Sequence, residues 1–283
     1  MVDRLHRRMD QFSPAERRIA RLVLFTGPAA ALGSVSTLSA RAGVSAPTVS
    51  RFAARLGFPD YASFQAALRE EVEARIASPQ RQYATARSDG EPLDRARDLF
   101  LETVGATFAD VSAADFSRAT ELVCDTLHHL VAFGGRFSGT LAAYLVAHLH
   151  ELRPRARLLD HDPGERAGVV LDTRRGDVAV VFDYRRYQRD VVELAEQLHE
   201  RGAVIVLFTD RWLSPVARFA EAVLAADVAG PSPFDSLVPA MALVEALVAA
   251  TVDRLGPDGE DRVRLFGQLA DRVVEGPPEQ VNR

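Results

Sequence analysis

The chain has 283 residues, of which 47% are apolar and 26% charged, a composition typical of a soluble protein with room for two domains. The net charge of −5 excludes a protein that is polybasic throughout. The charge is uneven, however: residues 1–80 hold 11 Arg against 7 acidic residues, and residues 81–283 hold 23 Arg against 32, so only the first part is expected to face a polyanion.

Cysteine content and hydropathy narrow the class further. Cys124 is the only cysteine, which excludes an intramolecular disulfide and a cysteine-based zinc site. The first residues lack the apolar core of a signal peptide. The longest apolar run, Leu237 to Val252, is interrupted by Glu245 and is too short for a membrane span. We therefore expect a cytoplasmic protein without a membrane partner, a metal or a cofactor.

The first 77 residues are predicted to form short helices. Ser13-Pro14-Ala15-Glu16 is a helix start, in which Ser13 is the N-cap and Glu16 closes a capping box. One face of this helix carries Ile19, Leu22, Val23 and Thr26. Gly27-Pro28 is expected to end it, and further helices are predicted at 36–42, 46–56 and 60–76.

Residues 36–57 have the plan of a helix-turn-helix, whose second helix lies in the major groove of DNA. Gly43 supplies the turn, and Ser45 caps the second helix with Pro47 in its first turn. The residues expected to pack the two helices together are Leu38, Ala42, Val44, Val49, Phe52 and Leu56. A small helical bundle without a DNA role is the alternative, but the agreement of these cues with the local positive charge favours DNA binding.

The outward residues of the second helix are the predicted DNA contacts. They are Ser45, Ala46, Pro47, Thr48, Ser50, Arg51 and Arg55. Ser45 and Thr48 lie at the helix N-terminus, where backbone N–H groups favour a phosphate. Arg51 either reads a guanine edge or contacts a phosphate, and the sequence leaves both possibilities open.

The pattern changes after a polar, breaker-rich stretch at 78–92, which is predicted to be a linker. A helical stretch at about 93–124, broken near Ser112, comes first. Short apolar runs then alternate with helices. The runs are 130–133, 156–159, 178–182, 204–208 and 222–226, and the helices are 138–152, 190–201, 215–219 and 235–255. Such alternation predicts a parallel sheet covered by helices.

The chain resembles the RpiR family of bacterial transcriptional regulators over nearly its whole length. The resemblance rests on Phe-Ser-Pro-Ala-Glu-Arg-Arg-Ile-Ala at 12–20, on Ala-Gly-Val-Ser-Ala-Pro-Thr-Val-Ser-Arg-Phe at 42–52, and on Leu-Gly-Phe-Pro-Asp-Tyr-Ala-Ser-Phe at 56–64. It implies an α + α/β fold. An N-terminal all-α helix-turn-helix domain (1–77) and the linker would precede a doubly wound, mainly parallel-sheet SIS-type (sugar isomerase) α/β domain (93–275), with a disordered tail at 276–283.

The same resemblance implies the partners of the chain. They are double-stranded DNA, a small anionic metabolite such as a phosphosugar or related sugar acid, and further copies of the chain in a homodimer or homotetramer. A dimer predicts an operator that is an inverted repeat.

The first loop of the SIS pattern is partly present. Such domains carry Gly-x-Gly-x-Ser-Gly after the first strand, and Gly134, Ser138 and Gly139 match this pattern, whereas Arg136 replaces the second glycine. The turn presents N–H groups to an anion, but the same residues also suit a tight strand–helix connection with Ser138 as the N-cap. The predicted effector contacts in this turn are Gly134, Gly135, Arg136 and Ser138.

The second loop departs further, because SIS domains that bind phosphosugars carry Ser-x-Ser-Gly-x-Thr where residues 183–190 read Asp-Tyr-Arg-Arg-Tyr-Gln-Arg-Asp. The arginines can bind an anionic group, with Tyr184 or Tyr187 stacking on a ligand ring; alternatively the loop is solvated or lies at an interface. Its place at a strand C-terminus favours the ligand role. The predicted effector contacts here are Asp183, Tyr184, Arg185, Arg186 and Arg189, with Thr209 at the end of the next strand. The missing hydroxyls argue against a simple sugar phosphate.

Other polar groups are weaker candidates. His148 and His150, two apart on a helix, point to different sides and do not suit a metal. Asp160-His161-Asp162 is interpreted as polar loop chemistry rather than as a metal or ligand site. A sugar-phosphate isomerase is the alternative function. It needs a carboxylate or histidine base, for which Glu221 and Glu245 are available, but no pairing singles either out, so we expect no catalytic residue.

Overall fold

The computed structural model describes residue 5 and residues 11–25, 33–76 and 91–275. The predicted helix end at Thr26, Gly27 and Pro28, the linker residues 78–90 and the tail 276–283 lie outside the described residues. Within the described part, no helix combines the length and the apolar character that a membrane span needs.

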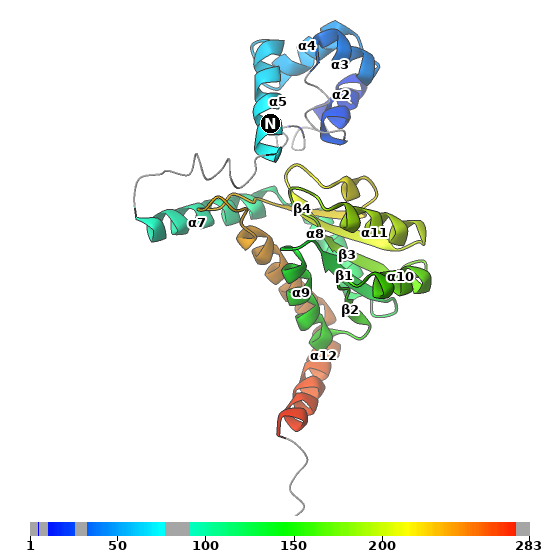
Figure 1. The fold of residues 1–283 in the computed structure, drawn as a ribbon. Coiled ribbons are helices and arrows are strands. Elements are labelled where there is room, and N and C mark those ends of the chain that lie inside the picture. The colour runs from blue at the N-terminus through cyan, green and yellow to red at the C-terminus, as the bar shows by residue number, and fades with distance from the viewer. Residues whose placement is uncertain (1–4, 6–10, 26–32, 77–90, 276–283) are drawn as a thin grey trace, which may run out of the picture.

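In the described part of the N-terminal region, short helices pack as a bundle: α2 (Pro14–Phe25), α3 (Val35–Ala42), α4 (Ala46–Arg55) and α5 (Tyr61–Ile76) (Figure 1). The predicted capping box at the start of α2 is confirmed, because the Ser13 amide donates to the Glu16 carboxylate at 2.8 Å and the Glu16 amide donates to Ser13 Oγ at 3.3 Å. Of the six residues expected to pack α3 against α4, five are buried and Val44 is half-buried. Phe52 lies at the centre of this core, with ring centroids of Phe12 and Phe64 at 5.2 and 6.1 Å.

The C-terminal region is an α/β domain built on a sheet in which all neighbouring strands are parallel. The described strands are β1 (Leu130–Gly134), β2 (Ala156–Leu158), β3 (Val178–Phe182), β4 (Val204–Asp210) and β5 (Ala222–Ala226), in the order β2-β1-β3-β4-β5. The helices are α7 (Pro92–Asp110), α8 (Ala113–Cys124), α9 (Gly139–Leu152), α10 (Pro163–Asp172), α11 (Arg189–Glu200), the 3-10 turn η3 (Pro215–Arg218) and α12 (Val238–Glu275). This arrangement confirms the predicted fold class.

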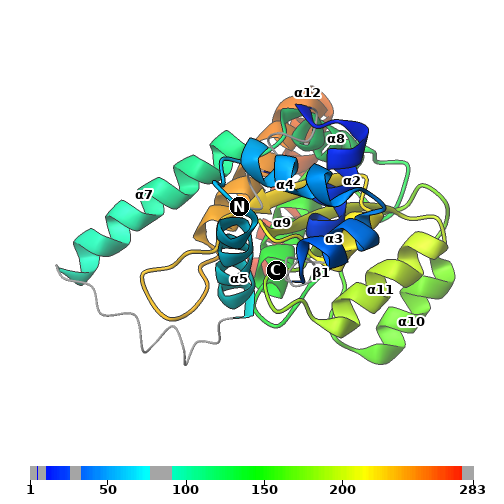
Figure 2. The same ribbon diagram turned by 90° about the horizontal axis from the view of Figure 1, so that it is seen from above.

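The sheet lies between two sets of helices, with α10 and α11 on one side and α8 and α12 on the other (Figure 2), and an apolar core fills each side. Val178, Val180 and Phe182 of β3 face the core shared with α8, α9 and α12. Ala179 and Val181 face the core shared with α10 and α11. Because both faces of β3 are buried, the strand is a continuous apolar run rather than an alternating one.

The last predicted helix, 235–255, is wrong at its start, whereas its predicted end at Leu255 agrees with the break at Gly256. It begins later, at Val238, whose amide donates to Ser236 Oγ at 3.1 Å, and the helical path continues beyond Gly256 to Glu275. Gly256 has φ 52° and Pro257 follows it, so one helix ends and a second begins directly, with proline at its start. Strand β4 also runs to Asp210, two residues beyond the prediction.

Candidate functional site

Helix α4 buries one side and exposes the other. Val49, Phe52 and Ala53 are buried, whereas Ala46, Pro47, Ser50 and Arg51 are exposed. Ser45 Oγ lies 2.8 Å from Thr48 Oγ1 and makes no cap hydrogen bond to the backbone, so the predicted side-chain cap is wrong. The structure therefore brings the predicted DNA contacts together along one face and at the N-terminal end of one helix.

The two arginines of this helix differ in their surroundings. Arg55 donates to the Glu16 carboxylate at 2.9 Å and to the Gln11 carbonyl at 2.6 Å, which ties α4 to the start of α2. Burial acts to raise the pKa of Glu16, but the hydrogen bonds from Ser13 and the charge of Arg55 outweigh it and lower this pKa. Arg51 is exposed and makes no such contact with the described residues. Arg51 is thus the better placed of the two to reach DNA.

In the α/β domain, the carboxyl ends of β1 and β3 lie side by side where the strand order reverses, the place where such sheets bind ligands. The β1 turn, residues 134–139, follows β1 and opens α9. A Cβ on Gly134 would lie 2.9 Å from the Gly139 nitrogen, the Phe182 oxygen and the Ser138 carbonyl carbon, so no side chain fits there. The turn is therefore held against the end of β3.

Ser138 fastens the same turn. Its hydroxyl donates to the Phe182 carbonyl at 2.7 Å and accepts from the Gly135 amide at 2.9 Å, and it does not cap α9. Among the described residues, the N–H groups of Phe137 and Ser138 donate to no other group. The turn therefore offers backbone donors, whereas the Ser138 hydroxyl is already used.

The β3 loop, residues 183–188, is held in place by hydrogen bonds to its first residue, Asp183. This carboxylate accepts a hydrogen bond from Ser214 Oγ at 2.5 Å and from the Gln188 amide at 3.2 Å. Thr209 Oγ1 donates to the Asp183 carbonyl at 2.7 Å. Because Asp183 is buried, its pKa is raised to about 7. Asp183 and Thr209 thus stabilise the loop through hydrogen bonds within the chain.

The aromatic and arginine side chains of this loop do not converge on one point. Arg185 pairs with Asp235 and lies over the Trp212 ring at 5.4 Å, with only 5% of its side chain exposed. Arg186 is exposed and has φ 70°, and it takes the glycine position when the Ser-x-Ser-Gly-x-Thr pattern is aligned from Asp183. The hydroxyl of Tyr187 donates to Asp210 at 2.7 Å, and Tyr184 is buried.

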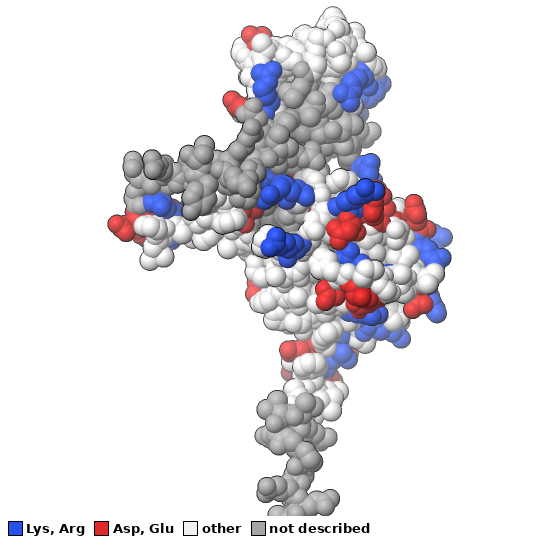
Figure 3. Space-filling model, viewed as in Figure 1, with Lys and Arg blue, Asp and Glu red and all other residues white. Residues whose placement is uncertain are grey.

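Arg189 belongs to α11 and not to the loop. It pairs with Glu193 at 2.6 Å and its side chain is 91% exposed. Acidic and basic side chains are interspersed over the visible face of α10 and α11 (Figure 3), so this face is no cationic patch. Of the predicted effector arginines, Arg136 in the β1 turn and Arg186 in the β3 loop are left exposed, and neither pairs with a carboxylate among the described residues.

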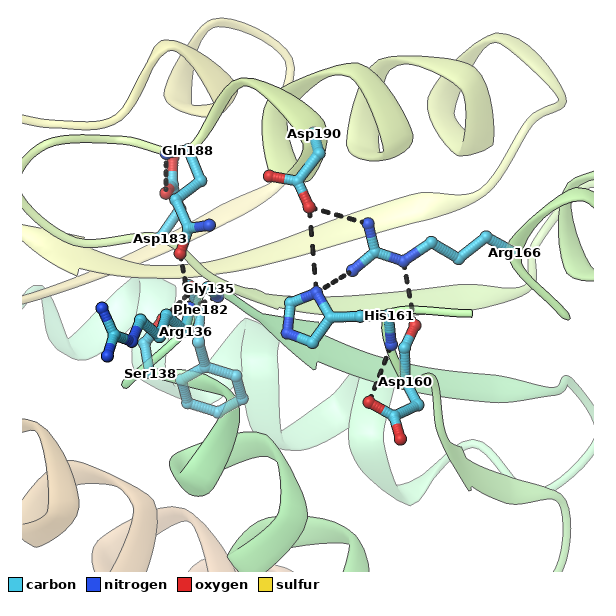
Figure 4. Close-up of polar contacts among 10 residues, drawn as sticks. All are labelled: Gly135, Arg136, Ser138, Asp160, His161, Arg166, Phe182, Asp183, Gln188 and Asp190. Atoms are coloured by element: carbon cyan, nitrogen blue, oxygen red, sulfur yellow. Dashed lines mark hydrogen bonds and ion pairs between the residues drawn. The ribbon is translucent and has the colours of Figure 1, made fainter. Parts of the chain in front are cut away.

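The sequence reasoning missed Gln188. Its side-chain Oε1 accepts a hydrogen bond from the Arg136 amide at 2.5 Å, so it joins the β3 loop to the β1 turn (Figure 4). A sequence cue for Gln188 exists, because it lies just before a predicted helix, at the N-cap position where Ser, Thr, Asp and Asn are preferred. In the structure its side chain makes no cap hydrogen bond.

A second polar cluster follows β2. Arg166 donates to Asp190 at 2.9 Å and lies 3.0 Å from Nδ1 of His161 (Figure 4). Asp162 caps α10 by accepting from the Glu165 amide at 2.7 Å. The described residues contain no group of three His, Cys, Asp or Glu side chains that could hold a metal. Asp162 has a local structural role as the N-cap of α10.

The two carboxylates considered for catalysis are elsewhere. Glu221 directly precedes β5, at the opposite end of the parallel sheet, and pairs with Arg118 at 3.1 Å. Glu245 of α12 accepts from the hydroxyl of Tyr144 on α9. A pocket of about 460 Å³ lies between the α7–α8 junction and β5, and none of the predicted effector contacts lines it.

Comparisons with known proteins cover both domains. A family model described as "Helix-turn-helix domain, rpiR family" matches residues 1–75, and one described as "SIS domain" matches residues 126–250. The HTH-type transcriptional regulator HexR of Pseudomonas aeruginosa is 25% identical over 274 residues, which cover 93% of this chain and 93% of that protein. HexR of Escherichia coli K12 is 24% identical over 259 residues, covering 89% and 84%.

Solved structures show the same fold. The sugar isomerase domain of an RpiR transcription factor from Sphaerobacter thermophilus is 26% identical with a TM-score of 0.57, covering 63% of this chain and 97% of that one. The Vibrio vulnificus NanR protein complexed with ManNAc-6P is 20% identical with a TM-score of 0.57, covering 96% and 98%.

Proposed function

Because this chain belongs to the RpiR family of transcriptional regulators, we propose that α4 reads an operator and that a small anionic metabolite, bound at the carboxyl ends of β1 and β3, controls that reading. One observation carries the DNA part: α4 buries its apolar side and leaves Arg51, Ser50 and its own N-terminus exposed. An exposed helix N-terminus suits a phosphate, and an exposed arginine suits a base edge or a phosphate.

The effector part rests on the ends of β1 and β3. Helices α9 and α11 both begin at these strand ends, and the Phe137 and Ser138 amides are available as hydrogen-bond donors. NanR, which shares the fold, is complexed with the anionic sugar derivative ManNAc-6P. We propose a phosphosugar or a related sugar acid as the class of effector. We name no single compound, because the hydroxyl groups of the usual phosphate-binding loop are replaced.

We also propose that the chain does not catalyse isomerisation. Its curated relatives are named as transcriptional regulators. The carboxylates considered as bases are engaged with Arg118 and Tyr144, and Glu221 lies at the end of the sheet opposite the β1 turn. A turnover assay on phosphosugars tests this, and sustained aldose–ketose conversion by the purified protein would contradict it.

Self-association is part of the proposal, because α7 carries an apolar face that the described residues leave exposed. Leu93, Leu101 and Phe108 are 82, 70 and 45% exposed, and α7 projects from the domain in Figure 1. The first half of α12, by contrast, buries Leu243, Val244 and Leu247 in the core. We expect a dimer or tetramer by sedimentation, on an inverted-repeat operator. Leu101→Asp should shift it toward monomer, and an unchanged sedimentation coefficient would argue against α7 as the contact.

The central experiment selects duplex DNA from a random pool with the full-length protein and then titrates the selected operator. Arg51→Ala should weaken operator binding by about 1–3 kcal/mol if Arg51 reads a base, with the loss confined to the selected sequence. An equal loss on every sequence identifies a phosphate contact instead. Arg69→Ala removes an exposed arginine of α5 and is the matched control, which should bind nearly as the wild type does. Equal losses in the two variants would contradict the role of α4.

Adding anionic sugars to the complex then tests the effector part. A phosphosugar or sugar acid should change operator affinity of the wild type, whereas the corresponding neutral sugar should not. If no member of a broad anionic panel changes operator affinity or the melting temperature, the effector part of the proposal is wrong.

A further inference from the structure

Two helices start at the candidate effector site, and one side chain lies between them. α9 begins at Gly139 after β1, and α11 begins at Arg189 after the adjacent β3. Gln188, the N-cap residue of α11, does not cap its own helix. Its carboxamide crosses instead to the β1 turn and accepts from the Arg136 amide (Figure 4).

The fit of Gln188 in the turn is close. A Cβ added to Gly135 would collide with Oε1 of Gln188, so the carboxamide fills the space that glycine leaves open. The main chain of Gln188 is held independently, because its amide donates to the buried Asp183. The side chain can therefore leave the turn without moving the start of α11.

The carboxamide uses the turn only in part. Its oxygen accepts from Arg136, whereas the neighbouring N–H groups of Phe137 and Ser138 donate to no described group. A neutral oxygen with a partial charge thus lies where two helix N-termini favour a full negative charge.

We propose that the Gln188 carboxamide is a built-in occupant of the anion-binding turn, which the anionic group of the effector must displace. The inference rests on the proposed function, because it takes the β1 turn as the anion site. A phosphate or carboxylate makes stronger, charge-assisted hydrogen bonds to the same amides and replaces the carboxamide. A neutral sugar hydroxyl offers no more than Gln188 already does. Gln188 therefore selects charged ligands over neutral ones.

The test uses the full-length protein with isotope-labelled glycine and inorganic phosphate as the probe. The amide signals of Gly135 and Gly139 report binding at the β1 turn itself. Gln188→Ala empties the turn and should bind phosphate about three- to tenfold more tightly, because one neutral hydrogen bond no longer has to be exchanged. Gln188→Glu supplies a permanent carboxylate and should weaken phosphate binding about tenfold or more.

Gln197→Ala is the matched control, since Gln197 is exposed on the same helix. It should leave the affinity for phosphate unchanged, and melting curves verify that all three variants are folded. Glucose, a neutral probe, should leave both glycine signals of the wild type in place.

The outcomes separate this inference from the proposed function. If the wild type binds phosphate at the turn and Gln188→Ala binds it equally or more weakly, Gln188 is no competitor: the inference is overturned and the anion site stands. If phosphate shifts neither Gly135 nor Gly139 in any variant, the anion site is absent, and the inference is overturned together with the effector part of the proposed function.

Discussion

Arg51 on α4 and Arg185 in the β3 loop are both arginines that the sequence predicts to be ligand contacts. The structure leaves Arg51 exposed, whereas it buries Arg185 against Asp235 and Trp212. The first can meet a partner without losing an internal contact. The second can do so only if an internal ion pair breaks. The two sites thus differ in whether the arginine is already paired with a carboxylate of the same chain.

The largest expected effect separates Arg185 from Arg186. Arg185→Gln leaves the Asp235 carboxylate, 20% exposed, without its cation, and should lower the free energy of unfolding by about 3 kcal/mol. Adding Asp235→Asn should restore a large part of that loss. Arg186→Gln, at an exposed position, should change stability by less than about 0.5 kcal/mol and alter only effector binding. Chemical denaturation measures all three. Equal stabilities for Arg185→Gln and Arg186→Gln would refute the difference between the two arginines.

The next effect is the pH dependence that Asp183 confers on the α/β domain. Burial raises the pKa of this carboxyl to about 7, so the native state holds a proton that the unfolded chain has released. Its contribution is therefore complete at low pH and is lost as the pH rises through about 7. Between about pH 6 and about pH 8.5 the wild type should lose about 1 kcal/mol of stability on this account. Asp183→Asn should remove that part of the slope, and an identical slope in both proteins would show that Asp183 is already ionised.

The smallest effect concerns Arg55, which the sequence groups with Arg51. Its side chain is 46% exposed, so loss of its pair with Glu16 in Arg55→Ala should lower stability by about 0.5–1 kcal/mol. The loss of operator affinity should be smaller than in Arg51→Ala. Thermal melting and operator titration of the two variants measure this contrast. A larger operator defect in Arg55→Ala would reverse the roles of the two arginines.

The range of each interaction decides what the sequence could predict. The capping box of α2 joins residues three apart, and the buried face of α4 follows from helical spacing. A local sequence pattern therefore predicts both, and the structure confirms them. Parallel strands were recognised because β3 and β4 are uninterrupted apolar runs.

The missed features join residues that are distant in the chain. Arg55 and Glu16 are 39 residues apart, Arg185 and Asp235 are 50 apart, and Gln188 and Arg136 are 52 apart. Nothing in a local pattern specifies which acid an arginine meets across such a separation. The β3 loop could therefore be placed at the site from the sequence, but the use of its side chains could not be predicted.

The parallel sheet has a consequence for the order in which the chain acquires structure. No pair of neighbouring strands can close through a short hairpin, so each pairing must wait for a crossover between them, and such topologies fold slowly. The helices α2 to α5 depend on closer contacts and leave the ribosome first. Trp212, the only tryptophan, follows β4 by two residues and is buried, so its fluorescence reports the packing around the end of that strand. Refolding should show helical circular dichroism before the tryptophan signal, and the operator-reading half would then be formed before the half that controls it.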